Sequence, residues 1–255
     1  MTGPDPRLVP GGWLQPDWPA PAGVRAAVST REVAGVSMAP FERFNLGSRC
    51  GDVPEAVAVN RAAVTAMLGL PRAPRWLRQV HGIDVAPFDG SEGEDEPEAD
   101  ASVTHARGEP LAILTADCLP VLFCAADGGE VAAAHAGWRG LANGVLEATL
   151  RRMRAPSAQV MAWLGPCIGA ASYEVGAEVR EAFVADDAAA AACFEPTRPG
   201  HWLCDLAGLA RRRLERAGVC AIHGGGFDTL VDARFYSYRR DAARSGRFAT
   251  LIWLA

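Results

Sequence analysis

The hydrophobic positions of this chain follow two periods, one typical of strands and one typical of helices. Short apolar runs predict buried strands, and apolar residues three or four positions apart predict helices. The predicted strands are Val24–Ser29, Trp76–Val80, Leu111–Leu114, Leu119–Ala125, Glu130–Ala134, Val160–Leu164 and Ala249–Leu254. The predicted helices run from Asp52 and Pro54 toward Leu68, through Trp138, Leu141, Val145, Leu146 and Leu150, around Gly176–Val184, and over Asp205–Ala217.

The order of these elements indicates the fold class. Helices and strands interleave, but some strands follow one another directly, which predicts an α+β fold, a layered α/β sandwich built on a mixed sheet. Residues 1–22 contain six prolines, and because each proline fixes φ and removes a donor, they predict an extended N-terminal lead-in. Residues 23–255 are predicted to form a single catalytic domain, since this length suits one hydrophobic core.

Composition and charge exclude several classes of protein. Hydrophobic residues make up 49% of the chain and charged residues 22%, as in an ordinary globular protein. The formal net charge of -5 gives no global attraction to nucleic acid or to an anionic membrane. The sequence shows neither a signal peptide nor about 18 uninterrupted apolar residues, so we expect a cytoplasmic protein without a membrane partner.

Most of the cysteines and one run of charged residues are expected to have structural rather than chemical roles. The seven cysteines are an odd number without the dense spacing of a disulfide scaffold, so most are expected to pack in the core. Cys167 follows a predicted buried strand and is expected to be one of these. The charge run Ser91–Asp100 is expected to be a solvated loop.

Three side chains that bind metals stand beside predicted turns. They are His81 before Gly82, Cys118 between two apolar runs, and His135 shortly before Gly137. Imidazole and thiolate suit zinc, and three protein ligands leave a fourth coordination position open for chemistry. The spacing matches no compact zinc-finger pattern, so from spacing alone each residue could equally be a packing or hydrogen-bonding residue.

Several longer motifs resemble one known family. The strings RQVHG, TADCLPVLF, EVAAAHAGWRGL, WLGPCIG, YEVG and FYSYRRD followed by SGR closely resemble the YfiH family of laccase-domain proteins, long labelled polyphenol oxidases. The resemblance extends from about Val24 to Ala255 and implies a YfiH-like layered fold. It also implies that His81, Cys118 and His135 are the metal ligands and act in catalysis.

The resemblance further implies an activity. Members of this family act on purine nucleosides, by phosphorolysis of adenosine, inosine and methylthioadenosine and by deamination of adenosine, so the expected partners are a nucleoside and phosphate. Some bacterial members are described as peptidoglycan editing factors. Zinc is the expected cofactor, because it can lower the pKa of bound water toward about 7. Asp117, beside Cys118, is a candidate for proton transfer or equally for a loop cap.

Five residues are candidates for binding the substrate. Arg139 lies in the first turn of a predicted helix, and Arg31 and Arg239 could make paired contacts to phosphate or ribose. Ser37 and Asn45 lie in a segment that resembles the nucleoside-contacting motif of the family. The sequence departs from the usual pattern of this family at two places. Residues 32–35 stand where members commonly have a shorter run with two glycines, and Asp228-Thr229 stands where many members have Cys-Thr.

Three other functions remain open at this stage. Two His and one Cys also make a mononuclear copper site, as in a copper-dependent polyphenol oxidase, although five histidines are too few for a multicopper laccase. Cys118 could instead be the nucleophile of an amide hydrolase that edits peptidoglycan precursors, with His81 or His135 as its base. A non-catalytic binding module is the third. The oligomeric state is open, and a monomer is plausible.

Overall fold

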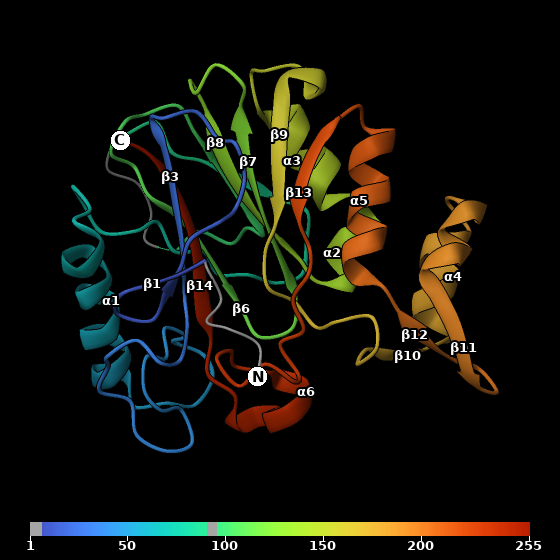
Figure 1. Cartoon of the computed structure of the whole chain (residues 1–255), viewed down its shortest axis with the longest axis horizontal. Helices are drawn as coiled ribbons and strands as arrows, with labels where there is room; N and C mark the ends of the chain where they lie inside the picture. The colour runs from blue at the N-terminus through green and yellow to red at the C-terminus, as the bar shows by residue number, and fades with distance from the viewer. Residues whose placement is uncertain (1–6, 91–95) are drawn as a thin grey trace.

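Two sheets stacked between layers of helices form the centre of the molecule in the computed structural model, which describes residues 7–90 and 96–255 (Figure 1). The first sheet is antiparallel throughout. Its strands, in spatial order, are β1 (Leu8–Val9), β2 (Trp13–Leu14), β3 (Val24–Ser29), β14 (Phe248–Leu254) and β6 (Leu111–Thr115).

The second sheet is mixed. Its outer pairs β13/β9 and β4/β5 are parallel, and its inner pairs are antiparallel. In spatial order it contains β13 (Ala221–Gly224), β9 (Val160–Leu164), β7 (Leu119–Ala125), β8 (Val131–Ala136), β5 (Ala101–Thr104) and β4 (Val85–Pro87). A small third sheet contains β10 (Glu174–Gly176), β12 (His201–Cys204) and β11 (Phe194–Arg198).

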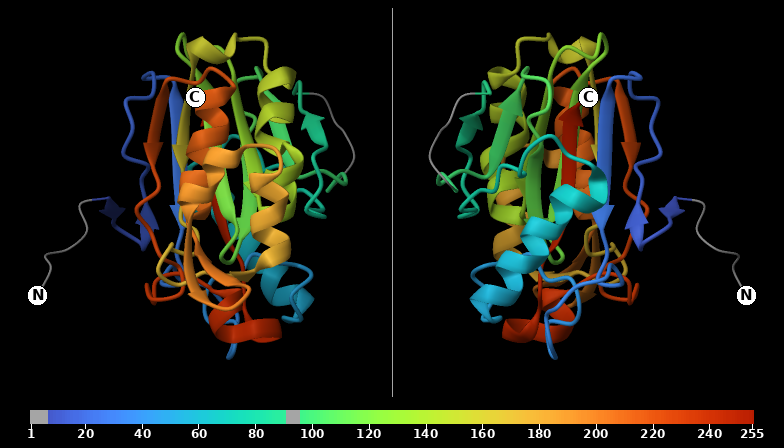
Figure 2. Two further views of the ribbon diagram at one scale, coloured as in Figure 1. Left: turned by 90° about the vertical axis from the view of Figure 1, so that its right-hand side faces the viewer. Right: turned by 90° about the vertical axis from the view of Figure 1, so that its left-hand side faces the viewer.

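Helices cover the outer faces of both large sheets (Figures 1 and 2). The first sheet is covered by α1 (Pro54–Leu68). The second is covered by α2 (Trp138–Asn143), α3 (Val145–Arg152) and α5 (Leu206–Arg216), and α4 (Ala177–Val184) packs beside them with the third sheet. The short helices are α6 (Tyr238–Asp241) and the 3-10 turns Ser157–Gln159, Ala188–Cys193 and Ala242–Arg244.

Strand β7 shows why the sequence forms this sandwich. Leu119, Val121 and Phe123 face the helices, while Leu122 and Cys124 face the first sheet. Every residue of β7 is therefore buried, which explains its continuous apolar run. The predicted α+β layered sandwich with a mixed sheet is confirmed.

The strand predicted over residues 76–80 is wrong. Isolated bridges at Arg75 and Arg78 replace a regular ladder. The side-chain carboxamide of Gln79 makes the pair of hydrogen bonds that a neighbouring strand would make with its backbone. Its Nε2 donates to the Leu114 carbonyl at 2.8 Å, and its Oε1 accepts the Leu114 amide at 2.9 Å. The segment before His81 is thus joined to the edge of β6 by a side chain.

Two other predictions need adjustment. The helical pattern from Trp138 to Leu150 divides into α2 and α3 at Gly144, whose φ of 95° interrupts the helix. The predicted lead-in contains β1 and β2, and β2 pairs with β3, while its first six residues lie outside the described residues. Among the helices that the structure describes, none is both long and apolar enough to cross a bilayer.

Candidate metal centre and its cavity

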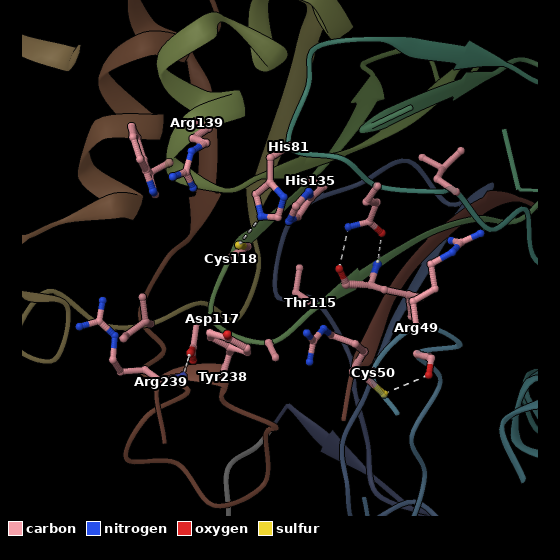
Figure 3. A pocket seen from close by; sticks show the side chains of 18 of the residues that line it. Arg49, Cys50, His81, Thr115, Asp117, Cys118, His135, Arg139, Tyr238 and Arg239 are labelled. Carbon is pink, nitrogen blue, oxygen red and sulfur yellow. Dashed lines mark hydrogen bonds between the residues drawn. The ribbon is translucent and has the colours of Figure 1, made fainter. Parts of the chain in front are cut away.

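The side chains of His81, Cys118 and His135 converge in one place (Figure 3). Their potential ligand atoms all lie within 4.8 Å of one another. Cys118 Sγ is 3.7 Å from His81 Nε2, and the two imidazole rings meet edge to face with centroids 4.7 Å apart. The structure thus brings the three predicted ligands close enough together to contact one ion.

Three different structural segments supply these side chains. Cys118 ends the turn between β6 and β7, and His135 lies near the end of β8, paired with Pro120 of β7. His81 comes from the irregular segment that Gln79 joins to β6. The site therefore forms where the two large sheets meet.

A buried carboxylate, Asp100, supports two of the three ligands. Its oxygens accept the backbone amides of Val80, His81 and Gly82 at 3.0, 2.9 and 2.7 Å. These bonds hold His81 at a φ of 62°, a conformation that few non-glycine residues adopt. Asp100 Oδ1 also lies 2.7 Å from His135 Nδ1, which leaves Nε2 of that ring to bind a metal.

The expectation that Ser91–Asp100 is a solvated loop is wrong at Asp100, and residues 91–95 lie outside the described residues. Asp100 is 0% exposed, and its hydrogen bonds with His135, Gly82 and Val80 outweigh burial and lower its pKa.

Gly137 leaves room for the side chains of His81 and Cys118 because it has no Cβ atom. A Cβ atom at this position would lie 2.6 Å from His81 Cδ2 and 3.0 Å from Cys118 Sγ. Any larger residue would therefore displace the ligands. A Cβ at Gly140 would similarly lie 2.9 Å from the Gly82 carbonyl oxygen, so α2 can approach the His81 turn closely.

The Cys118 thiol and the His135 imidazole shift each other's pKa. Burial raises the pKa of Cys118, but the charge and hydrogen bonds of His135 and His81 outweigh burial and lower this pKa to about 6. Burial lowers the pKa of His135, but Cys118 and Asp100 outweigh it and raise this pKa to about 9. The cluster thus favours the thiolate, which is the form of cysteine that binds metals.

The donor set fits a zinc ion. One thiolate and two imidazoles are ligands that zinc prefers, and a site with three protein ligands keeps a coordination position for a reactant. The bond from Asp100 to His135 is the arrangement that usually orients a metal-binding histidine. A cation at this point would also take the place of the proton that Cys118 and His135 otherwise share.

A cavity of about 490 Å³ opens beside the cluster. Residues from both large sheets, from the loop at residues 47–50, from α2 and from the segment around α6 form its wall. They are Gly47, Ser48, Arg49, Cys50, Arg61, Leu77, Gln79, His81, Leu114, Thr115, Ala116, Asp117, Cys118, His135, Trp138, Arg139, Ile168, Tyr173, Tyr238, Arg239 and Arg247.

Three arginines of this wall each stack on an aromatic ring. The guanidinium carbon lies 4.4 Å from the ring centroid for Arg139 over Trp138, 5.3 Å for Arg239 over Tyr173, and 5.9 Å for Arg247 over Tyr238. Within residues 7–90 and 96–255, none of the three arginines pairs with a carboxylate. Their charges are therefore available to an anion.

Not every predicted binding residue reaches this cavity. Arg139, Arg239 and Asp117 line it, whereas Arg31, Ser37 and Asn45 are not among its lining residues. Arg31 lies over the ring of Tyr236 at 5.1 Å, and its Nε donates to a backbone carbonyl. A substrate contact by these three residues stays a prediction.

Ser37 and Asn45 have clear partners within the protein. Both donate to the Asp52 carboxylate, at 2.6 and 2.9 Å. Asn45 Oδ1 also accepts the backbone amides of Gly47 and Arg247 at 3.0 and 2.7 Å. Asn45 thus fixes two segments of the cavity wall from behind.

Sequence reasoning missed Arg49, Cys50, Tyr173, Tyr238 and Arg247 as cavity residues. Tyr173 and Tyr238 stand in motifs that carried the family resemblance, YEVG and FYSYRRD, which is the signal that could have found them. Cys167, in contrast, is buried in the core beside the second sheet. Burial raises its pKa, in agreement with a packing role.

The fold and the site together define an α+β sandwich protein with a His2Cys cluster that can hold one metal ion beside a ligand-sized cavity. The family model described as multi-copper polyphenol oxidoreductase laccase matches residues 25–255. The chain belongs to this family.

Relatives with names and known structures agree with this assignment. A Xylella fastidiosa protein named purine nucleoside phosphorylase is 52% identical, over 96% of this chain and 98% of that protein. An Escherichia coli protein named purine nucleoside phosphorylase YfiH is 50% identical, over 94% and 98%. A crystal structure of a Neisseria meningitidis protein matches with a TM-score of 0.88 at 45% identity, over 95% of this chain and 99% of that one.

In its described residues, the site does not have the several groups of donor side chains that the multi-copper description of the family implies. Several copper ions require several clusters of donor side chains. In the part of the chain that the structure describes, His81, Cys118 and His135 are the group of three or more such residues that comes together. The structure therefore offers donors for a single ion.

Proposed function

We propose that this protein is a zinc-dependent purine nucleoside phosphorylase that cleaves adenosine, inosine and methylthioadenosine with phosphate and also deaminates adenosine. The observation that carries this proposal is the position of the His2Cys cluster in the wall of a cavity that also contains aromatic rings and arginines, three of which have no carboxylate partner in the described part of the chain. The name purine nucleoside phosphorylase, which relatives at about half identity carry, supports a purine nucleoside and phosphate as the substrates.

The cavity has the size and chemistry for a purine nucleoside with phosphate. Its volume of about 490 Å³ lies within the usual range for small-molecule sites, about 300–1,000 Å³. Trp138, Tyr173 and Tyr238 offer flat surfaces for a purine ring. Arg139, Arg239 and Arg247 offer paired donors for phosphate oxygens.

His81, Cys118 and His135 would hold the zinc ion. Zinc bound there would supply a Lewis acid with one free coordination position. The protein's own part is to orient these ligands through Asp100, to hold phosphate near the arginines, and to keep the base against the aromatic wall. Holding both reactants in one orientation removes much of the entropic barrier to their reaction.

Deamination requires a group that moves protons, and zinc deaminases of other folds use a glutamate. Among the residues that the structure describes, no glutamate lines this cavity and Asp117 is its one carboxylate, with hydrogen bonds to both oxygens. We therefore rank phosphorolysis above deamination for this site.

A Cys118-dependent amide hydrolase is the second candidate, because Cys118 Sγ lies within 3.7 Å of His81 Nε2 and its pKa is lowered to about 6. The two functions differ in their need for metal. Activity that survives chelation and is lost on thiol alkylation would favour the hydrolase. A copper oxidase would reveal itself by metal analysis and a coloured copper-thiolate centre, whereas a zinc protein is colourless.

The deciding experiment incubates the purified zinc-loaded protein with adenosine or inosine, with and without phosphate. We expect adenine or hypoxanthine to form only when phosphate is present, together with ribose 1-phosphate, and inosine to form more slowly from adenosine. Chromatography resolves all of these products. If phosphate changes nothing and no base or inosine appears, the proposed function is wrong.

Substitution of Cys118 tests the role of the cluster. Cys118→Ala removes the thiolate ligand, and we expect turnover to fall by at least about 1,000-fold, with loss of bound zinc, because the remaining two imidazoles do not hold the ion in place. Cys220→Ala is the matched control, since Cys220 is an exposed free cysteine that does not line the cavity. Equal activity of the two variants would contradict the proposal.

A further inference from the structure

Asp117 occupies a constrained position next to the metal ligands. It lies in the turn between β6 and β7, directly before Cys118, and its φ of 84° places it in the left-handed region. Aspartate and asparagine tolerate this region better than most residues. The contacts around Asp117 therefore have to hold its backbone in this left-handed conformation.

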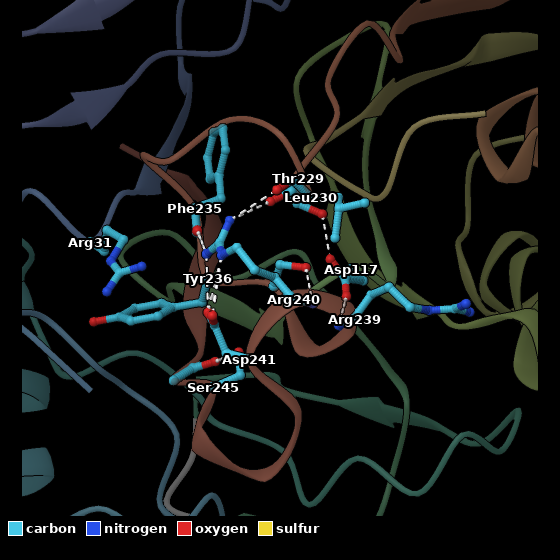
Figure 4. Close-up of polar contacts among 12 residues, drawn as sticks. Arg31, Asp117, Thr229, Leu230, Phe235, Tyr236, Arg239, Arg240, Asp241 and Ser245 are labelled. Carbon is cyan, nitrogen blue, oxygen red and sulfur yellow. Dashed lines mark hydrogen bonds and ion pairs between the residues drawn. The ribbon is translucent and has the colours of Figure 1, made fainter. Parts of the chain in front are cut away.

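Thr229, Arg239 and Ile168 bond to Asp117 from distant parts of the chain, and Figure 4 shows the first two of these partners. Its Oδ1 accepts the Thr229 hydroxyl at 2.6 Å, and its Oδ2 accepts the backbone amide of Arg239 at 2.6 Å. Its own carbonyl accepts the backbone amide of Ile168 at 3.0 Å. Both carboxylate oxygens thus make short hydrogen bonds within the protein.

Arg239, whose amide bonds to Asp117, is held at its other end as well. Its Nη1 donates to the Glu174 carbonyl at 3.1 Å, and its guanidinium stacks on Tyr173. This guanidinium lines the cavity without a carboxylate partner in the described part of the chain. Its direction into the cavity depends on where Asp117 places its backbone.

The segment that carries Arg239 is cross-linked by hydrogen bonds from the neighbouring Arg240. The Arg240 guanidinium donates to the carbonyls of Thr229, Leu230 and Phe235 at 3.2, 3.1 and 2.8 Å (Figure 4). Arg240 therefore ties the segment from Thr229 to Arg240 together, and Asp117 joins this segment to the turn that bears Cys118.

We propose that Asp117 is a positioning residue, which fixes Arg239 relative to Cys118 and so sets the distance between bound phosphate and the metal. This inference rests on the proposed function for the identity of the anion. It differs from a proton-transfer role, because a proton shuttle needs a carboxylate oxygen that faces the reactant.

Two substitutions separate these roles. Asp117→Asn removes the ionisable group but can keep both contacts, because the Asn oxygen accepts the Arg239 amide and the Thr229 hydroxyl can turn to accept from the Asn amide. Asp117→Gly keeps the left-handed backbone but removes both side-chain bonds. We expect Asp117→Asn to stay within about 3-fold of the wild-type protein in kcat and in affinity for phosphate.

For Asp117→Gly we expect at least about 10-fold weaker binding of phosphate, because two short hydrogen bonds to a charged group are lost. Calorimetric titration of the zinc-loaded protein with inorganic phosphate measures this directly. The result does not depend on turnover, so a failure of the inference can be told apart from a failure of the proposed function. The KM for phosphate and kcat complete the comparison.

Thr229→Val provides a milder variant should Asp117→Gly fail to fold, and we expect its affinity for phosphate to fall in the same direction by about 3-fold or more. Asp127→Asn and Asp127→Gly are the controls, since Asp127 caps a backbone amide in an exposed turn at the other end of β7. The inference is overturned if phosphate binds equally to wild type, Asp117→Gly and Thr229→Val. It is also overturned if Asp117→Asn loses as much kcat as Asp117→Gly, or if the wild-type protein binds no phosphate.

Discussion

Asp100 shows how one buried side chain can organise a site to which it contributes no ligand. It receives three consecutive backbone amides at residues 80–82 and one imidazole nitrogen of His135. A carboxylate that accepts so many donors stays ionised when buried. Its negative charge also strengthens His135 as a ligand for a cation.

Asp100→Asn should therefore weaken metal binding. An asparagine has one acceptor oxygen in place of two, so it cannot satisfy both the His81 turn and the His135 ring. We expect zinc affinity to fall by about 10 to 100-fold, as measured by competition with a chromogenic chelator. Asp127→Asn, which lies outside the site, should not change the affinity, and an unchanged value for Asp100→Asn would show that its support of the ligands is dispensable.

The sequence could indicate the ligands but not Asp100. His81, Cys118 and His135 stand in distinctive motifs, whereas Asp100 is the last of several acidic residues in the run from Ser91. In the sequence nothing separates this buried carboxylate from its acidic neighbours. Its role depends on the pairing of β5 with β8, which brings Asp100 beside His135.

At the scale of elements, prediction succeeded where a strand has a continuous apolar run. Strands such as β7 and β9 are covered on both faces, so their apolar runs are continuous and were found. The strands β4, β5, β10, β11, β12 and β13 were not predicted, because they are short and mostly lack such a run. Residues 76–80 have an apolar pattern yet form no strand, since the Gln79 side chain occupies the edge of β6.

Strand β14 contains a polar group whose replacement should stabilise the protein. Thr250 is fully buried, and its hydroxyl has no hydrogen-bond partner among the residues that the structure describes. Valine has the same shape without the unsatisfied group, so we expect Thr250→Val to raise the free energy of unfolding by about 1 kcal/mol.

Chemical denaturation measures this change. Thr149→Val is the contrasting variant, because the Thr149 hydroxyl donates to the Val145 carbonyl at 2.7 Å and its removal should bring no such gain. A loss of stability in Thr250→Val would mean that its hydroxyl has a partner after all, such as a buried water.

At the scale of the whole molecule, the negative net charge gives no indication of the positive charge around the cavity. A chain with a formal charge of -5 nevertheless places Arg139, Arg239 and Arg247 around one opening. The sequence excluded nucleic acid as a general partner on the basis of total charge. It could not show this local excess, because the three arginines come together only when the two sheets and α2 pack.

Metal binding should stabilise the entire fold. A ligand that binds the folded state alone adds about 4 kcal/mol when its free concentration is 1,000 times its dissociation constant. For a chain of this size we expect the Tm of metal-free protein to rise by roughly 10 °C on addition of zinc. Scanning calorimetry measures the rise, and Cys118→Ala serves as the control that should not respond.

The Gln79 carboxamide joins the His81 segment to the first sheet, while Asp100 joins the same segment to the second. His81 can thus meet the other two ligands only in a chain whose halves have already docked. The rate of zinc binding during refolding would then report the rate at which the two sheets dock. A folding intermediate in which the sheets have not yet docked would be recognisable because it does not bind zinc.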